Sequence, residues 1–238
     1  MDEEKLSAPP APAANDAAAR QDGPPQGFLE LVYGVLFEPV AAFSRVVQRL
    51  PLGQTVLIFT LVNLLVAFMN GLVMSRLMHN PAAVHMAVMM VKAMTPVLVI
   101  LGLTFQFAKW FTYSALLHLL AEFLGGRGRA VGVWTVAGLA SLPGIFLVPV
   151  NLVLLLFGVR GFALSLLVYL FGFLVLIWGM ILLILGIRQE HALSTGRAAA
   201  VVLLPVGAVV VGGVVLVIAL MATAASFMPF LPVPGWRP

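Results

Sequence analysis

A half-polar stretch at the centre of the chain, Phe105–Pro143, decides the fold; it reads FQFAKWFTYSALLHLLAEFLGGRGRAVGVWTVAGLASLP. It holds a lysine inside an apolar run, a histidine and a glutamate one helical turn apart, a basic glycine turn and a proline break. The apolar runs on either side of the turn have about the 20 residues that an α-helix needs to cross a bilayer. The stretch therefore predicts two membrane spans joined by a short polar turn.

The composition places the whole chain among membrane proteins. Of its 238 residues, 62% are hydrophobic and 9% are charged, against about 25% charged in an average soluble domain. The absence of cysteine excludes disulfides, thiolate nucleophiles and cysteine-based metal sites. The net charge of +4 comes from basic residues spread over the predicted loops, so it reflects membrane topology and does not indicate a nucleic-acid partner. We predict an all-α, polytopic membrane helix bundle.

Five segments are long and apolar enough to cross a membrane. We predict a membrane domain over residues 28–222, with spans at about 54–74, 95–121, 131–157, 161–187 and 198–222. Pro143, in the SLPG sequence of the third span, should break that span into two half-helices. Before the domain, residues 1–27 are polar and proline-rich and are predicted to be disordered. After it, residues 223–238 form a Pro- and aromatic-rich tail that suits a membrane interface.

An amphipathic segment precedes the first span at residues 28–50. Its apolar residues recur every three or four positions, while Glu30, Arg45 and Arg49 lie off that stripe. Pro39 should divide the segment, because proline suits the first turn of a helix and clashes with a preceding one. We therefore predict two short amphipathic helices. Two placements remain open: in the membrane interface, or packed on the protein's own cytosolic loops.

The basic residues outside the spans predict the orientation. With a cytoplasmic N-terminus, eight of them lie on the cytoplasmic side and four on the other, with Lys109 in the membrane. By the positive-inside rule, the N-terminus is then cytoplasmic and the C-terminus external. The cytoplasmic set is Lys5, Arg20, Arg45, Arg49, Arg127, Arg129, Arg188 and Arg197, and the external set is Arg76, Lys92, Arg160 and Arg237.

Lys109 is the first candidate for a functional site. A charge at the bilayer centre costs about 2.5–3.5 kcal/mol in insertion measurements, so such a residue tends to face a cavity or a partner. Gln106 and Tyr113 share its helical face, and Asn63 and Asn151 lie near the middle of their own spans. Together they form a hypothetical binding cluster for a small transporter or channel. The alternative is a structural lysine that snorkels toward an interface.

A second polar group is predicted at the cytosolic edge. His118 and Glu122 end the second span, and Glu190 and His191 end the fourth. Imidazoles and carboxylates are metal ligands, so a metal site at His118, Glu122 and His191 is one hypothesis. Hydrogen bonds between helices and loop capping are the favoured explanation, and we assign no metal ligand.

The GGRGR turn at residues 125–129 adds Arg127 and Arg129 to the cytosolic edge. It lacks the spacing and the lysine of a P-loop, and its charges suit lipid headgroups. No HEXXH or GXSXG motif accompanies these residues, and the predicted spans contain no aspartate. We predict no catalytic residue, no cofactor and no enzyme activity.

Small residues repeat every seven positions along the fourth span, at Gly158, Ser165, Gly172, Gly179 and Gly186. Such a face lets another helix approach closely. The partner is predicted to be a helix of the same bundle or, through Gly172, Gly179 and Gly186, a second copy of the chain.

Several segments, in their order and spacing, resemble the Yip family of Yip-one domain proteins. They are GVLFEPVAAFSRV (34–46), HLLAEFLGGRG (118–128), SLP (141–143) and HALSTGRAAAVVLLP (191–205), and the resemblance extends over about residues 28–221. It implies five spans, a cytosolic N-terminus and a lumenal or external C-terminus. Eukaryotic members carry a DLYGP-like motif where this chain has VLFEPVAAF. That departure argues against a Rab-type GTPase partner and for a prokaryotic-type member in a bacterial plasma membrane.

These features together predict a non-enzymatic membrane scaffold or adaptor that contacts lipids or partner proteins. The polar residues suit packing better than chemistry, which is why the scaffold is preferred. A small transporter or channel that uses Lys109 is one alternative. A membrane metal-binding protein at His118, Glu122 and His191 is the other.

Overall fold

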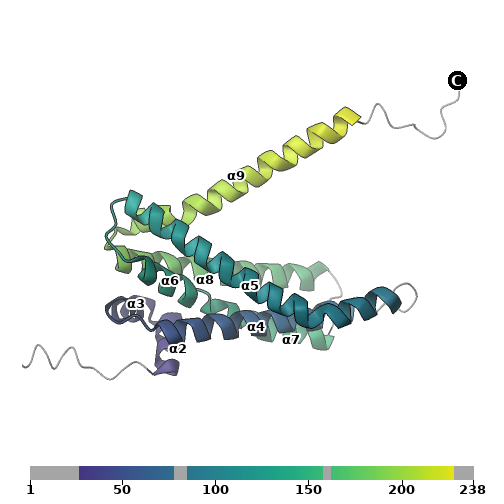
Figure 1. Cartoon of the computed structure of the whole chain (residues 1–238), viewed down its shortest axis with the longest axis horizontal. Coiled ribbons are helices and arrows are strands. Elements are labelled where there is room, and N and C mark those ends of the chain that lie inside the picture. The colour runs from purple at the N-terminus through teal and green to yellow at the C-terminus, as the bar shows by residue number, and fades with distance from the viewer. Residues whose placement is uncertain (1–26, 78–84, 158–161, 228–238) are drawn as a thin grey trace, which may run out of the picture.

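The computed structural model describes residues 27–77, 85–157 and 162–227, which are helical with no strand among them (Figure 1). Most of the two predicted tails, 1–27 and 223–238, lies outside these ranges. In chain order the elements are α2 (Phe28–Phe37), α3 (Pro39–Gln48), α4 (Leu52–Leu77), α5 (His85–Phe123), α6 (Ala130–Leu139), the 3₁₀ helix η1 (Leu142–Phe146), α7 (Leu147–Phe157), α8 (Phe162–His191) and α9 (Thr195–Phe227).

The prediction of five helical spans is confirmed. The helical segments that are long and apolar enough to cross a membrane are Leu52–Val73, Val97–Phe123, Ala130–Phe157, Leu166–His191 and Thr195–Ala224. Several helices extend beyond the predicted spans: α5 begins at His85, before the predicted start at about residue 95, and α9 continues to Phe227, past the predicted end at about residue 222. At ~1.5 Å per residue, the 39 residues of α5 extend well beyond the ~30 Å core of a bilayer.

The predicted break in the third span is also confirmed. Helix α6 ends at Leu139, and Pro143 lies in the first turn of η1, where its missing N–H costs no hydrogen bond. The Ser141 hydroxyl donates to the Gly138 carbonyl oxygen over 2.7 Å and so satisfies one of the carbonyls that the break exposes. Leu142 and Pro143 are both buried, so the break is covered by protein rather than by lipid.

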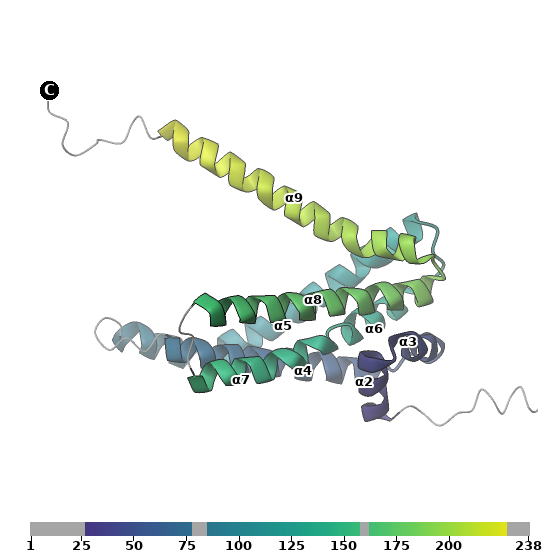
Figure 2. The same cartoon turned by 180° about the vertical axis from the view of Figure 1, so that it is seen from behind.

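Helices α2 and α3 meet at Glu38 and Pro39, as the proline predicted. They lie at the end of the bundle where α5 and α8 end and α6 and α9 begin, which we call the α2–α3 end (Figures 1 and 2). Helix α3 contacts α8, α2 contacts η1, and Arg129 of the turn before α6 donates to the Val47 carbonyl oxygen, so both helices pack on the protein itself. The outer side of α2 stays apolar and exposed at Leu29, Tyr33 and Phe37, which suits a membrane interface.

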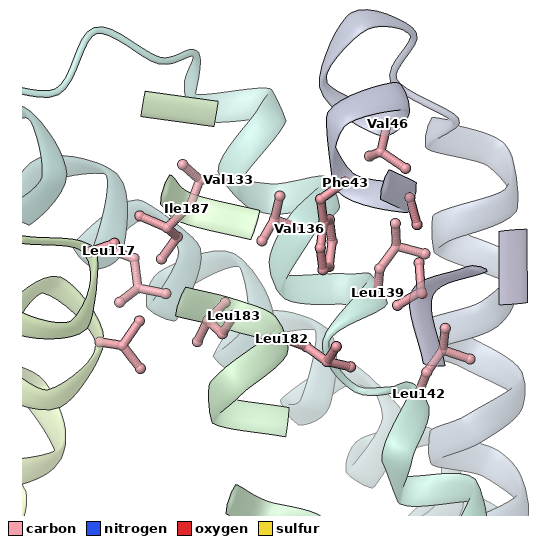
Figure 3. Packing of buried hydrophobic residues seen from close by; sticks show 14 of the residues in the cluster. Phe43, Val46, Leu117, Val133, Val136, Leu139, Leu142, Leu182, Leu183 and Ile187 are labelled. Atoms are coloured by element: carbon pink, nitrogen blue, oxygen red, sulfur yellow. The ribbon is translucent and has the colours of Figure 1, made fainter. Parts of the chain in front are cut away.

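The core is concentrated at the α2–α3 end and centres on α6. Figure 3 shows Phe43 reaching from α3 toward Val136 and Leu139 of α6, with Leu182 of α8 below it and Ile187 of α8 beyond Val136. These five side chains are fully buried. Beyond this core, α9 diverges from the other helices in both overall views (Figures 1 and 2), and its residues after Val202 are mostly exposed.

The seven-residue glycine repeat of α8 is divided between two environments. A Cβ on Gly186 would overlap Val136 Cγ1, and a Cβ on Gly179 would lie 3.2 Å from the Ala140 carbonyl oxygen. Outside its own helix backbone, a Cβ on Gly172 would meet no atom of the described residues within 4 Å. Gly179 and Gly186 therefore pack against other parts of the same chain. Self-association through this face stays a prediction, and of the three glycines only Gly172 is accessible to a second copy.

We expect Gly186→Ala to lower the free energy of unfolding by about 2 kcal/mol, because overpacking a filled core costs about 1–3 kcal/mol. Gly172→Ala is the matched control in the same helix, and it should be neutral or slightly stabilising, since alanine favours a helix by about 1 kcal/mol over glycine. Thermal unfolding in one detergent measures both. Equal melting temperatures for the two variants would contradict the division of the glycine face.

Candidate functional site

The structure brings together the polar residues predicted at the cytosolic edge. They come from the last turns of α5 and α8 and from the GGRGR turn between α5 and α6. We call the set formed by His118, Glu122, Arg129, Glu190 and His191 the polar edge. Two chains of contacts run through it, one through Glu190 and one through the two histidines.

The Glu190 side chain is 1% exposed and is held by Arg129. Its Oε1 atom accepts hydrogen bonds from the Arg129 backbone N–H over 2.9 Å and from Arg129 Nε over 3.2 Å. Arg129 is the N-cap of α6, so the carboxylate lies at the positive end of that helix. The same guanidinium donates from Nη2 to the Val47 carbonyl oxygen over 2.6 Å. One ion pair thus joins α8, α6 and the end of α3.

Gly132, in the first turn of α6, supports the Glu190 carboxylate. A Cβ at this position would overlap the carboxyl carbon, so no other residue type lets the two helices come this close. The second oxygen, Oε2, is buried and has no hydrogen-bond partner among the described residues. The carboxylate is therefore positioned by packing on one side and by Arg129 on the other.

The two histidines form a directional chain of hydrogen bonds. The Gly128 backbone N–H donates to His191 Nδ1 over 3.0 Å, so His191 carries its proton on Nε2. That nitrogen is 3.4 Å from His118 Nδ1, which therefore accepts. His118 then carries its proton on Nε2, which is 3.3 Å from Glu122 Oε1. The chain leads from a buried imidazole to a carboxylate that is 53% exposed.

The GGRGR turn fits closely over the end of α8. Gly125 has a positive φ of 88°, a conformation that favours glycine. A Cβ on Gly126 or Gly128 would lie 2.6 Å from an atom of His191 or Glu190. The Arg127 backbone N–H donates to the His191 carbonyl oxygen over 3.3 Å, which satisfies a carbonyl at the end of the helix. The turn is therefore held by backbone contacts, and the Arg127 side chain is exposed.

The metal hypothesis gains no support from this geometry. No group of three or more histidines and carboxylates is placed to hold a metal ion within the described ranges. All four ring nitrogens of His118 and His191 are engaged by Gly128, by each other or by Glu122. The arrangement can orient protons and fix helix ends, and it offers a metal no free imidazole nitrogen.

The intramembrane residues proposed around Lys109 have different partners. Lys109 is exposed on the outside of α5, with Nζ 5.8 Å from the centre of the Phe105 ring. The Asn63 amide nitrogen donates to the Phe59 carbonyl oxygen of its own helix over 2.8 Å. The Asn151 amide nitrogen donates to Asn70 Oδ1 over 2.9 Å. Gln106 and Tyr113 are half-buried beside Lys109 on α5. A binding role for these residues stays a prediction.

We expect Lys109→Met to fold with an unchanged or higher melting temperature, because it removes an exposed charge that costs up to about 3 kcal/mol at the bilayer centre. Trp110→Ala is the contrasting control. Trp110 is 5% exposed, stacks on Trp134 at 4.0 Å and donates to the Trp134 carbonyl oxygen; its loss should cost about 3–5 kcal/mol. Expression yield and thermal unfolding test both. Loss of folded Lys109→Met protein would show that the lysine is structural.

Two groups that contact the polar edge were not identified from the sequence. Gly132 and the Val47 carbonyl meet it only through tertiary contacts. The one available signal was the GGRGR turn itself, since three glycines in five residues indicate a backbone that passes close to another group.

A comparison with family models finds one match, described as the Yip1 domain, over residues 33–231. The matched range begins in α2 and includes the five candidate spans and the whole polar edge. No curated protein and no solved structure matches the chain.

Proposed function

The chain belongs to the Yip1 domain family and is an integral membrane protein, and from this premise we propose that it is a non-enzymatic scaffold whose α2–α3 end faces the cytoplasm and contacts anionic lipid headgroups. The N-terminus is then cytoplasmic and the C-terminus external. The contacts within the polar edge are the observation that carries the proposal.

The contacts of the polar edge hold the ends of several helices together. Arg129 and Glu190 join α3, α6 and α8, and His118 and His191 join α5 to α8. The imidazoles that would be needed for acid–base chemistry are already engaged with other protein groups. This supports a role in holding the helix ends and the turn in one fixed arrangement.

The GGRGR turn and the first turn of α9 carry exposed basic side chains next to the polar edge. Arg127 is exposed on the fixed turn, and Arg197 is exposed in the first turn of α9, with Nη1 3.5 Å from the Leu124 carbonyl oxygen. Basic residues near an anionic leaflet contribute about 1 kcal/mol each to binding. The exposed apolar residues Leu29, Tyr33 and Phe37 of α2 lie at the same end and suit the boundary between headgroups and acyl chains.

The test is retention of anionic lipid. Wild-type protein purified in mild detergent should keep phosphatidylglycerol in preference to phosphatidylcholine in native mass spectrometry. The variant Arg127→Gln/Arg197→Gln should lose that preference by roughly tenfold or more, as expected from two contacts of about 1 kcal/mol each. Lys109→Gln is the matched control, because it removes a charge from the middle of α5.

Equal retention by the double variant and wild type would contradict the proposal. So would a protein partner, rather than lipid, that is lost from native membranes when Arg127 and Arg197 are replaced. In that case the same basic surface would serve an acidic partner protein.

A further inference from the structure

An open cavity of about 480 Å³, closer to a surface groove than to an enclosed pocket, lies between α4, α7 and α8, away from the polar edge. Its volume lies within the range of about 300–1,000 Å³ that is typical of small-molecule sites. Apolar side chains of α7 and α8 form most of its lining, and the Asn70 and Asn151 side chains supply its amides. None of its lining residues belongs to the polar edge.

The ends of the candidate spans give the depth of the cavity along the helices. Asn70 lies three residues before the end of its span at Val73, and Tyr169 lies three residues after the start of its span at Leu166. At ~1.5 Å per residue, both are about 5 Å from the span ends opposite the α2–α3 end. Leu176 lies ten residues from the start of its span, or about 15 Å deep, near the middle of a ~30 Å core.

Polarity therefore falls along the cavity from its outer end to its inner end. Asn70 and the exposed Tyr169 lie about 5 Å from the span ends, and Asn151, six residues before Phe157, lies about 9 Å deep rather than near the middle of its span as predicted. Leu147 and Leu176 lie near the bilayer centre. A glycerolipid has the same profile, with ester groups near the interface and acyl chains that run to the centre.

The two amides supply both kinds of hydrogen-bonding group. Asn151 Nδ2 donates to Asn70 Oδ1 over 2.9 Å, a contact that uses one donor and one acceptor. An amide side chain has two donors and a carbonyl acceptor, so this contact does not use the Asn70 amide nitrogen or the Asn151 carbonyl oxygen, and both can bond to a ligand. These groups match the ester carbonyl oxygens of a lipid and any hydroxyl that its glycerol region carries.

Gly172 keeps the apolar part of the cavity open. Outside its own helix backbone, no atom of the described residues lies within 4 Å of a Cβ built at this position, although other parts of the chain cover Gly179 and Gly186 on the same face. A larger side chain at residue 172 would fill part of the space between the lining residues.

We propose that this cavity binds one membrane glycerolipid from the leaflet opposite the α2–α3 end. The ester region lies at the Asn70–Asn151 pair, and one acyl chain runs past Gly172 toward Leu176. The inference is independent of the proposed headgroup contacts, which involve the other leaflet and other residues.

Photocrosslinking tests the site. The protein is reconstituted in phosphatidylcholine vesicles that contain a small fraction of phosphatidylcholine with a diazirine in the middle of one acyl chain, and crosslinked peptides are mapped by mass spectrometry. Crosslinks should concentrate between Val168 and Leu176. Gly172→Leu should remove most of them, and Asn70→Leu should reduce them about 2- to 10-fold, as expected for one net hydrogen bond.

Gly213→Leu on α9 is the matched control, because that glycine is equally open and belongs to an exposed apolar segment. It should leave the crosslinks at residues 168–176 unchanged. If Gly172→Leu does not fold, Val168→Phe narrows the same cavity from the adjacent turn of α8 and provides the same comparison.

Two results would overturn the proposal. One is crosslinking spread evenly over the exposed faces of α8 and α9 and unaffected by Gly172→Leu, which would mean bulk bilayer contact only. The other is efficient disulfide formation between copies of Gly172→Cys at high dilution in vesicles, which the cysteine-free chain makes easy to detect. That result would place a second copy, and not a lipid, on this face.

Discussion

Arg129→Ala should lower the free energy of unfolding by about 3 kcal/mol, at the lower end of the cost of breaking a buried ion pair by removing one partner. The Glu190 side chain is 1% exposed, while that of Arg129 is 57% exposed. Removing the arginine therefore leaves a buried carboxylate with only the backbone N–H of residue 129 as a partner. The contact of the same guanidinium with Val47 is also lost, which releases the end of α3.

Two variants separate this effect from a simple loss of charge. Arg127→Ala removes the same charge from an exposed side chain two residues before Arg129, and it should leave the melting temperature unchanged. Glu190→Gln in the Arg129→Ala background neutralises the buried carboxylate and should recover most of the lost stability. Chemical unfolding in mixed micelles measures all three proteins. Arg129→Ala with wild-type stability would show that the ion pair does not hold the edge together.

Gly132→Ala should also destabilise the protein by about 3 kcal/mol, at the upper end of the cost of overpacking a core. This stability change has the opposite sign to that of an ordinary glycine-to-alanine change in a helix, which stabilises the protein by up to about 1 kcal/mol. The added methyl would overlap the Glu190 carboxyl group, which is buried and bound twice by Arg129, so it cannot move aside without breaking both bonds.

Gly207→Ala is the matched control, since a Cβ there meets no atom within 4 Å; it should be neutral or slightly stabilising. The double variant Gly132→Ala/Glu190→Ala should be more stable than expected from the sum of the two single changes. The shorter side chain at residue 190 removes the clash with the new methyl group, and the methyl group fills part of the space that the carboxyl group leaves. Thermal unfolding by size-exclusion chromatography gives the comparison. Strict additivity of the two changes would exclude a steric contact between residues 132 and 190.

The local features of the fold could be predicted from residue order alone. The five spans follow from length and hydrophobicity, because every backbone polar group in lipid must be satisfied within its own helix. The breaks at Pro39 and Pro143 follow from a missing N–H and a fixed φ. The contact between His118 and Glu122 follows from four-residue spacing on one helix. None of these inferences requires knowledge of which helices are neighbours.

The contacts that define the polar edge needed the tertiary structure. Arg129 and Glu190 are 61 positions apart, and His118 and His191 are 73 apart, so no local period relates them. Gly132 and Gly172 are alike in sequence as glycines of apolar spans. Only the packing makes one a contact point for a carboxylate and leaves the other in an open cavity.

Residue order alone thus determined the class of protein, the number of spans and the position of the breaks, and the arrangement of the helices decided the function-bearing contacts. Whether a segment can cross the bilayer depends on the length and hydrophobicity of that segment alone, so the spans can be recognised from the sequence. In a bilayer, helices associate through close packing and a few polar contacts rather than through burial from water, so apolar periodicity says little about which faces meet. That is why Lys109, the most conspicuous residue of the sequence, lies exposed on α5, while a carboxylate, a glycine and two histidines join the helices at the α2–α3 end.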